Sequence, residues 1–274
     1  MPDPIRARIR FAYTQTRASK SVTVNPVSTF MFFLLAGAGL VWRFRLGDVT
    51  FFARYVDWVA VDEIALRGEY TQVVSELLAG KEKPVIVDLG ANIGLFSALV
   101  FRQVPSAIAH AVEPSYATYR ILEKNRKANP KLDWRTHWSA MWGTDGEVHF
   151  VEDGKASTAS HVGADRGYTV VPAMSLATLF AEHVRTPIDL LKVDVEGAEE
   201  VVLCSNPTLL KQVEALIVEI HPYRCDQARV VRTLEAGFDY LYDVRSDRAS
   251  RKPLLLASRR RYNVPCTASP GGSV

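Results

Sequence analysis

Cysteine is scarce in this sequence, and its most continuous apolar run is too short to cross a bilayer. The three cysteines among 274 residues, Cys204, Cys225 and Cys266, show no paired metal-ligand spacing. We therefore expect neither a disulfide framework nor a zinc site. The apolar run, Phe30 to Val41, falls short of the roughly 20 residues that a membrane-spanning helix needs. It predicts a packed helix, with a peripheral membrane contact as the alternative.

Net charge is also small, at +3, and this favours neither nucleic acid nor an acidic surface as partner. Basic residues nevertheless cluster near both ends of the chain, as Arg6, Arg8, Arg10, Arg17 and Lys20 and as Arg245, Arg248, Arg251, Lys252 and Arg259 to Arg261. The simpler interpretation is a solvated face. The alternative is attraction to a phosphorylated substrate or an anionic surface.

Three parts are expected along the chain. Residues 1–80 form an N-terminal helical and β-hairpin extension, residues 81–266 the main domain, and residues 267–274 a disordered tail. In the extension, Asn25 and Pro26 predict a helix that runs to the Gly37/Gly39 pair. The alternation around a Gly47-Asp48 break predicts a hairpin over 41–52, and a helix from Val61 through Leu78 leads into the core.

From Pro84 the pattern becomes strand, turn and helix, repeated. Strands are expected at 85–87, 107–112, 134–141, 188–193 and 215–220, then at 240–244 and at 254–257 or 262–264, with helices at 95–103, 115–128, 175–184, 198–203 and 226–235. The Gly-rich stretch 152–169 is expected to be a loop. This alternation predicts an α/β fold, a doubly wound Rossmann-like parallel sheet with helices on both faces. Ligands in such sheets bind beyond the carboxyl ends of the strands.

The turn after the first strand indicates the cofactor. Gly90 and Gly94 let the backbone approach a ligand, and Glu113, at the end of the second strand, can accept two ribose hydroxyls. A nicotinamide site would have glycine at the position of Asn92, against the pyrophosphate. Asp88 suits an ammonium or sulfonium better than a phosphate. These residues predict S-adenosylmethionine and disfavour the alternative, a nucleotide-dependent oxidoreductase.

A second motif carries a specific resemblance. The run Leu191-Lys-Val-Asp-Val-Glu-Gly-Ala-Glu199 resembles the K-x-D-x-E-G-x-E signature of the FkbM family of methyltransferases, and the run 87–94 fits that family equally well. Gly68-Glu69-Tyr70 and Val218-Glu219-Ile220-His221 also match. The resemblance spans about 55–245 and implies a class I methyltransferase fold. It assigns the cofactor to Tyr70, Asp88, Gly90, Ala91, Asn92, Gly94, Glu113, Ser139 and Ala140. No acid stands at Ser139 or Ala140 to read the adenine amine, as it does in many relatives of the fold.

Candidate catalytic residues follow the fourth and fifth strands of the repeat. Lys192, Asp194 and Glu196 alternate on one side of the fourth strand, and Glu219 and His221 alternate at the end of the fifth. Asp194 or His221 is the expected base for an acceptor hydroxyl. Structural roles stay open: Glu196 at a helix N-terminus, His221 as a strand end, and Lys192 as the partner of Asp194. We assign no metal site, although Mg²⁺ bridging a substrate diol is compatible with these residue types.

The expected function is methylation of a hydroxyl on a sugar, a glycan or a polyketide-type small molecule. A nucleic-acid methyltransferase would have an N-P-P-[YF]-like motif after the fourth strand, and Asp194-Val-Glu-Gly197 is not one. A non-catalytic binding module would have no use for acids at the ends of two strands. The cofactor and the cysteine content predict a cytoplasmic location. A homo-oligomer stays open.

Overall fold

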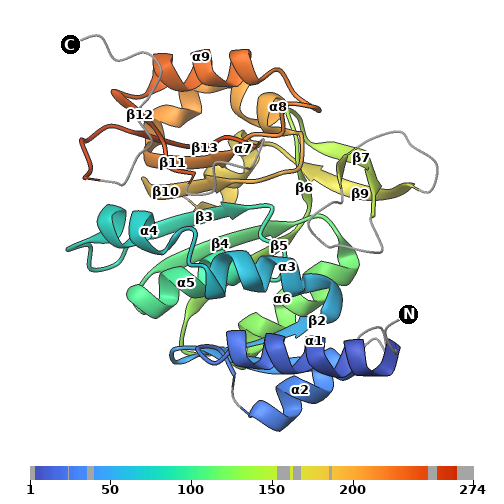
Figure 1. Cartoon of the computed structure of the whole chain (residues 1–274). Coiled ribbons are helices and arrows are strands. Elements are labelled where there is room, and N and C mark those ends of the chain that lie inside the picture. Colours follow the sequence, from blue (N-terminus) through green and yellow to red (C-terminus); the bar gives the residue numbers. More distant parts are fainter. Residues whose placement is uncertain are drawn as a thin grey trace.

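One sheet organises the chain, and short β-branched runs supply its central strands. The computed structural model describes residues 4–23, 25–35, 40–152, 161–162, 168–184, 187–245 and 252–263. The tail expected to be disordered, 267–274, lies outside them. The seven strands have the order β12-β13-β11-β10-β3-β4-β5 (Figure 1). Their bounds are β3 Val85–Leu89, β4 Ile108–Glu113, β5 Asp133–Trp138, β10 Ile188–Val193, β11 Val213–Glu219, β12 Tyr240–Asp243 and β13 Leu254–Ser258.

The central strands run parallel and are held in a register that aligns their carboxyl ends. Leu191 of β10 pairs with Val87 of β3 on one side and with Leu216 of β11 on the other. Only β13 runs antiparallel among the described strands of this sheet, between β11 and β12. The expected doubly wound α/β fold is confirmed.

Alternate residues of these strands enter two separate apolar layers. Ile86 and Leu190 belong to one layer, with helices α4 (Thr71–Leu78), α5 (Leu95–Gln103) and α6 (Tyr116–Ala128). Val87 and Leu191 belong to the other, with α7 (Leu176–Thr178), η4 (Leu179–Val184), α8 (Glu199–Cys204) and α9 (Gln227–Gly237). Both faces of the sheet are therefore covered, as its apolar strands require.

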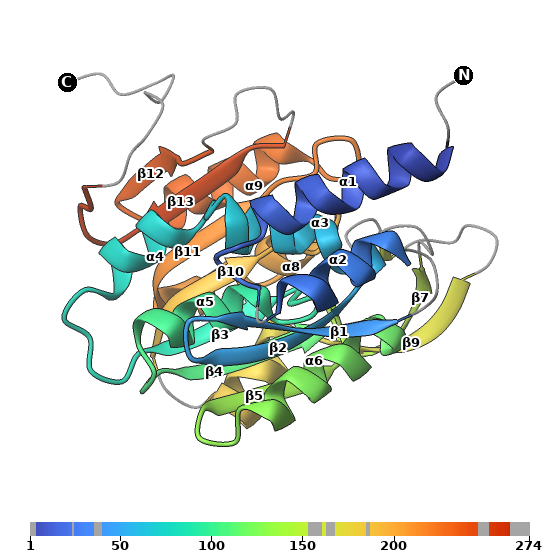
Figure 2. The same cartoon turned by 60° about the horizontal axis from the view of Figure 1, so that its bottom comes forward.

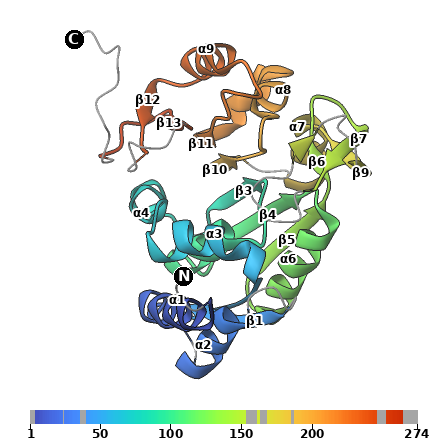
Figure 3. The ribbon, with the colours of Figure 1, turned by 45° about the vertical axis from the view of Figure 1, so that its right-hand side comes forward.

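The N-terminal residues form a third layer over the α5–α6 face. It contains α1 (Pro4–Ala18), α2 (Pro26–Leu34), β1 (Val41–Leu46), β2 (Val49–Arg54), η1 (Tyr55–Asp57), α3 (Trp58–Ala60) and the π-helix η2 (Val61–Leu66). The Asn125 carboxamide of α6 accepts from the N–H of Phe52 and donates to its carbonyl, which fixes β2 on α6. The apolar layer of α4 to α6 continues into these residues. In Figure 3, α1 and α2 lie at the far end of the molecule from β12 and β13.

A smaller sheet lies beside the carboxyl edge of β4 and β5. Its order is β6-β9-β7-β8, with bounds β6 Ala140–Met141, β7 Gly146–Val151, β8 His161–Val162 and β9 Tyr168–Met174. The chain leaves the main sheet at Ser139, so the strand expected over 134–141 is two strands in two sheets. The expected loop 152–169 contains β8 and the first residues of β9, and its segments 153–160 and 163–167 lie outside the described residues.

Helix boundaries differ from expectation at defined backbone positions. The helix expected over 61–78 is interrupted because Gly68 has a φ of +69°, which ends a right-handed helix. Helix α2 begins at Pro26 under the Asn25 cap as expected but ends at Leu34, and Gly37 and Gly39 lie outside the described residues. The helix over 175–184 continues from α7 as a π-helix.

The last strand is the earlier of the two candidates, Leu254–Ser258. Tyr262 is in no strand, and Val264 lies outside the described residues. Among the described helices, none has the length and apolar content to span a membrane. The termini of the described chain lie on the outside of the molecule (Figure 2).

Candidate active site

A cavity of about 330 Å³ opens at the carboxyl ends of the central strands. Its walls come from the turn after β3, the ends of β4, β10 and β11, the small sheet, and the α3–η2 segment. All the predicted site residues line it except three: Asp88, Gly94 and His221. This is the place that the strand topology indicated.

The turn after β3 is in contact with the turn after β10. Gly90 has a φ of +70°, and a Cβ there would lie 1.7 Å from the carbonyl oxygen of Asp194, so no other residue fits. Asn92 also has a positive φ, +52°. The two turns thus pack backbone against backbone, which brings the predicted cofactor residues and the predicted catalytic residues into one cavity.

Gly94 has a different role from the one expected of it. Its φ is +88°, and a Cβ there would lie 2.4 Å from the ring of Trp134 and 2.6 Å from Leu122. Gly94 therefore allows the start of α5 to pack closely against β5 and α6. The cofactor role that the resemblance gave it stays a prediction, and the contacts support a packing role.

Glu113 ends β4 with both carboxylate oxygens directed at backbone donors. Oε2 accepts from the N–H of Asn92 and Oε1 from the N–H of Ser115, each at 2.9 Å. Burial raises the pKa of Glu113 to about 7, although the two N–H donors pull it down. Each oxygen keeps acceptor capacity for a ligand hydroxyl, since a carboxylate oxygen can accept two hydrogen bonds.

The adenine side of the predicted site is formed where the chain leaves the main sheet. Ser139 is buried, and its hydroxyl donates to the carbonyl of Pro172 at 3.0 Å. Ala140 and Met141 line the cavity beside it, and so do Phe150 and Val162 of the small sheet. The wall is apolar, with no acid among these residues, as the sequence indicated.

A buried lysine joins the two turns electrostatically. Lys192 Nζ donates to the carbonyl of Gly90 at 2.9 Å and lies 3.4 Å from Asp88 Oδ1 and 3.3 Å from Asp194 Oδ2. Asp88 is fully buried and accepts from the hydroxyl of Ser97 at 2.8 Å. Asp88 therefore lies behind the cavity wall, where it positions Lys192 and the turn. The sequence had suggested that Asp88 contacts the cofactor, but it does not line the cavity.

Asp194 presents its carboxylate to the cavity, with 27% of its side chain exposed. Burial alone would raise its pKa, but the positive charges of Lys192, His221 and Lys252 outweigh this effect and lower it. At neutral pH Asp194 is therefore an ionised hydrogen-bond acceptor.

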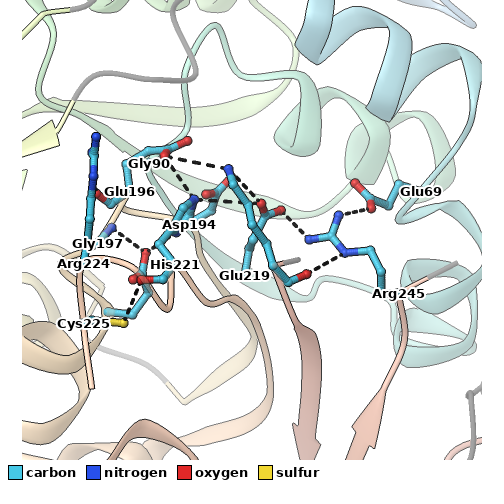
Figure 4. A network of polar contacts seen from close by, with 12 residues as sticks. Glu69, Gly90, Asp194, Glu196, Gly197, Glu219, His221, Arg224, Cys225 and Arg245 are labelled. Carbon is cyan, nitrogen blue, oxygen red and sulfur yellow. Dashed lines mark hydrogen bonds and ion pairs between the residues drawn. The ribbon is translucent and has the colours of Figure 1, made fainter. Parts of the chain in front are cut away.

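His221 is fully buried between two carboxylates (Figure 4). Nδ1 lies 2.9 Å from Glu199 Oε1 and Nε2 lies 3.0 Å from Glu196 Oε2. Burial alone would lower its pKa, but the two carboxylates raise it to about 10. An imidazolium at neutral pH has no lone pair to accept a proton, so this geometry argues against His221 as the base. It supports a positioning role for His221, which holds the turn of Glu196 (φ +51°) in its left-handed conformation.

An ion-pair chain crosses the far side of the cavity (Figure 4). Arg245 bridges Glu69 and Glu219, with 2.8 Å between its Nη2 and Glu219 Oε2. Lys252 Nζ lies 3.3 Å from Glu219 Oε1 and 3.9 Å from Glu196 Oε2. This chain ties the end of β11 to the segment that precedes α4.

Sequence reasoning did not assign Glu63 or Lys252 to the site. Glu63 lies on the π-helix η2 and lines the cavity, and burial together with the charges of Glu69 and Glu219 raises its pKa to about 7. The acid pair Asp62 and Glu63, between apolar Val61 and Ile64, was the signal that could have found it. No local pattern marks Lys252. Tyr70, assigned from the resemblance, does line the cavity, and its ring packs on Phe96.

Three residues could in principle offer ligands to a metal ion. Among the described residues, Asp194, Glu219 and His221 have ligand atoms within 4.8 Å of one another. A histidine must be neutral to bind a metal, and His221 has a raised pKa. Lys192 and Lys252 already supply positive charge to the two acids. The donor set therefore fits a network neutralised by side chains better than a cation site.

Comparisons with known proteins agree with this geometry. A family model described as the methyltransferase FkbM domain matches residues 88–243. The chain belongs to the FkbM methyltransferase family. It is 25% identical to the hexuronic acid methyltransferase AglP of Haloferax volcanii over 202 residues, which cover 72% of this chain and 83% of AglP. It is 29% identical to the methyltransferase sdnD of Sordaria araneosa over 215 residues, which cover 65% of this chain and 82% of sdnD.

Solved structures agree on the fold of this FkbM-family chain. The METTL16 methyltransferase domain matches with a TM-score of 0.54 at 12% identity, covering 95% of this chain and 94% of that domain. At that identity the likeness concerns the fold alone, which is that of class I S-adenosylmethionine-dependent methyltransferases. The chain is thus a methyltransferase, and the oxidoreductase alternative is wrong.

Proposed function

We propose that this protein transfers a methyl group from S-adenosylmethionine to a hydroxyl of a sugar, a glycan or a polyketide-type small molecule. The observation that carries the proposal is the backbone contact of Gly90 with Asp194, because the turn of the predicted cofactor residues and an ionised carboxylate then line one cavity. One relative is a hexuronic acid methyltransferase, and this likeness supports a sugar acceptor.

The residues fit S-adenosylmethionine chemically. The free acceptor capacity of Glu113 suits two ribose hydroxyls, and the wall of Ala140, Met141 and Phe150 suits an adenine ring. In the opposite part of the cavity, the carboxylate of Glu69 suits the ammonium of the cofactor, and that of Asp194 suits its sulfonium, a charge that S-adenosylhomocysteine lacks. When bound, S-adenosylmethionine would supply an electrophilic methyl group on its sulfonium sulfur, which would pass to the acceptor oxygen with S-adenosylhomocysteine as the leaving group.

In this proposal Asp194 orients the acceptor hydroxyl and takes its proton. Lys192 keeps the carboxylate ionised and fixed against the cofactor turn, so that positioning provides much of the rate. Lys252, beside Glu196 and Glu219, screens these acids from an acceptor that itself carries a carboxylate. We propose that no metal takes part, since side chains already neutralise the acids.

The test is Asp194→Asn, assayed with labelled S-adenosylmethionine against a panel of hexuronic acids, neutral glycans, nucleotide sugars and macrolides. We expect turnover to fall about a hundred- to ten-thousandfold, the usual range for loss of a general base. Affinity for S-adenosylhomocysteine should change little. The exposed Asp239→Asn is the matched control and should retain full activity.

Three results would count against the proposal. Full activity of Asp194→Asn on a hydroxyl acceptor would remove Asp194 from the mechanism. Loss of activity in EDTA, restored by Mg²⁺, would show that Asp194 and Glu219 hold a metal ion. A panel in which only amines are methylated would replace the hydroxyl by a nitrogen acceptor and leave the cofactor assignment intact.

A further inference from the structure

The N-terminal segment has a one-sided charge that the catalytic site does not explain. From Pro4 to Gly47 the sequence contains seven arginines and lysines and no aspartate or glutamate. The whole chain has 33 basic and 30 acidic residues, so this segment departs sharply from the composition of the rest. Such a segment attracts a negatively charged partner.

Helix α1 also exposes large apolar side chains to solvent, where a surface helix usually has polar ones. Ile5, Ile9 and Tyr13, spaced four residues apart, form one stripe with exposed fractions of 68%, 44% and 57%. Arg10 and Arg17 are exposed beside this stripe, and the Arg17 guanidinium lies 5.9 Å from the centre of the Tyr13 ring. Apolar and basic residues thus share the outer surface of the helix.

Helix α2 extends this surface. Its inner side buries Phe32 and Phe33, while Val27 is 71% exposed and Met31 is 36% exposed on its outer side. A groove of about 440 Å³ lies between the two helices, and Arg17 and Lys20 line it together with apolar Tyr13, Pro26, Val27 and Phe30. We call the outer surface of α1 and α2 the N-terminal face.

We propose that the N-terminal face binds the surface of an anionic lipid bilayer. Interfacial helices combine low overall hydrophobicity, exposed apolar side chains and many arginines or lysines, and they lie in the plane of the membrane. A bilayer supplies both the negative headgroups and the apolar layer that this face requires. The helices are too short to cross it, which agrees with the absence of a spanning helix among those described.

Two other occupants fit the face less well. Nucleic acid would satisfy the arginines but offers little to exposed Ile9 and Val27. A second copy of the chain would bring the same basic residues against each other, with no acid in the segment to offset them. The bilayer is therefore the occupant that charge and apolarity favour together.

The N-terminal face is connected to the cavity through aromatic packing. The rings of Phe33 and Trp58 lie 4.4 Å apart, and Val59, the next residue, lines the cavity. Docking of this face would hold the cavity wall near the membrane surface. Membrane binding does not depend on the proposed acceptor, so it can be tested without an activity assay.

The experiment is co-sedimentation of the full-length protein with vesicles of phosphatidylcholine and phosphatidylglycerol in a two-to-one ratio, and with pure phosphatidylcholine vesicles. We expect binding to the anionic vesicles, reversed by high salt. The triple variant Arg10→Gln/Lys20→Gln/Arg17→Gln should bind about a hundredfold more weakly, because each basic residue near such a surface contributes about fivefold. Tyr13→Ser/Val27→Ser should bind more weakly at every salt concentration.

Matched controls lie on exposed positions elsewhere. Arg120→Gln/Lys211→Gln/Arg232→Gln controls for charge, and Val170→Ser/Tyr240→Ser controls for exposed apolar area. Both should bind vesicles like the unchanged protein. Equal binding to neutral vesicles, or no binding to either kind, would overturn the proposal. It would also be overturned if sedimentation velocity showed a dimer that Tyr13→Ser/Val27→Ser dissolves, or if only nucleic acid bound.

Discussion

At Glu113, burial and hydrogen bonding act on one carboxyl in opposite directions. Burial raises its pKa to about 7, while the backbone N–H groups of Ser115 and Asn92 favour the ionised form. A ribose needs the ionised form, because only a carboxylate has acceptors for both hydroxyls. With Glu113 in its proposed role at the ribose, we therefore expect cofactor binding to be sensitive to pH near neutrality.

The corresponding prediction is that Glu113→Gln lowers the affinity for S-adenosylhomocysteine about ten- to hundredfold, the usual effect of losing hydrogen bonds to a charged group. Calorimetry should also show that the unchanged protein binds more weakly as pH falls from 8 to 6, since protonation of Glu113 removes acceptor capacity. The Glu113→Gln variant should lose the part of this dependence that belongs to Glu113, and any remainder reports Glu63, whose pKa burial also raises to about 7 in the same cavity. Glu147→Gln, at an exposed position, is the control. An unchanged affinity in Glu113→Gln would show that Glu113 does not bind the ribose.

The fate of His221 and Asp88 shows what residue-level sequence reasoning misses. The pattern placed both near the site, and the structure puts both behind it, one between Glu196 and Glu199 and the other against Lys192. Strand alternation predicts the side of a sheet on which a residue lies, but it does not predict which side chains form hydrogen bonds or ion pairs with it. Those pairings depend on contacts between distant segments, and short-range spacing contains no record of them.

Among the elements, the strands were more predictable than the turns that join them. The strands at 85–89, 108–113 and 188–193 were expected within one or two residues, because a strand buried on both faces needs a continuous apolar run. The break at Gly68 and the departure of Ala140 into a second sheet were not expected. The break follows from the positive φ of Gly68, and the departure of Ala140 depends on a partner far along the chain, Ala173.

Gly94, in the turn between β3 and α5, can serve helix packing or cofactor binding. A comparison with Gly80, which precedes β3, distinguishes the two roles. Gly80 and Gly94 both have positive φ, but a Cβ at Gly80 would meet nothing within 4 Å, whereas one at Gly94 would meet Trp134. Gly80→Ala should lower the free energy of unfolding by about 1–2 kcal/mol, the cost of placing a Cβ in the left-handed conformation. Gly94→Ala should cost about 1–3 kcal/mol more through overpacking.

Urea unfolding of the two variants measures this difference directly. If Gly94 packs α5 against β5, Gly94→Ala loses stability and cofactor affinity together. If Gly94 instead serves the ligand alone, the two variants should be equally stable and only Gly94→Ala should bind S-adenosylhomocysteine poorly. The second result would restore the role that the resemblance gave it.

For the molecule as a whole, the question is whether the N-terminal extension is a separate unit. The sequence divides the chain at residue 80 because the repeating strand and helix pattern begins after it. The structure has one apolar layer that continues across that point, from Phe32 and Phe44 through Val73 to Phe96 and Phe101. Asn125 of α6 is also bonded to the backbone of Phe52. A change of sequence pattern therefore marks a change of topology without marking the limit of a core.

A truncation series distinguishes these cases. Removal of residues 1–18 deletes α1, whose buried hydrophobic residue is Ala12, so we expect a folded protein whose melting temperature falls by only a few degrees, about 2–4 °C per kcal/mol lost. Affinity for S-adenosylhomocysteine should be unchanged, since α1 contributes no residue to the cavity lining. Removal of residues 1–80 would expose Phe96 and Phe101, which are each 1% exposed, and should leave an aggregating chain without a cooperative unfolding transition. A soluble 81–274 fragment that unfolds cooperatively and binds S-adenosylhomocysteine would instead show that the catalytic domain folds alone and that the extension is an added layer.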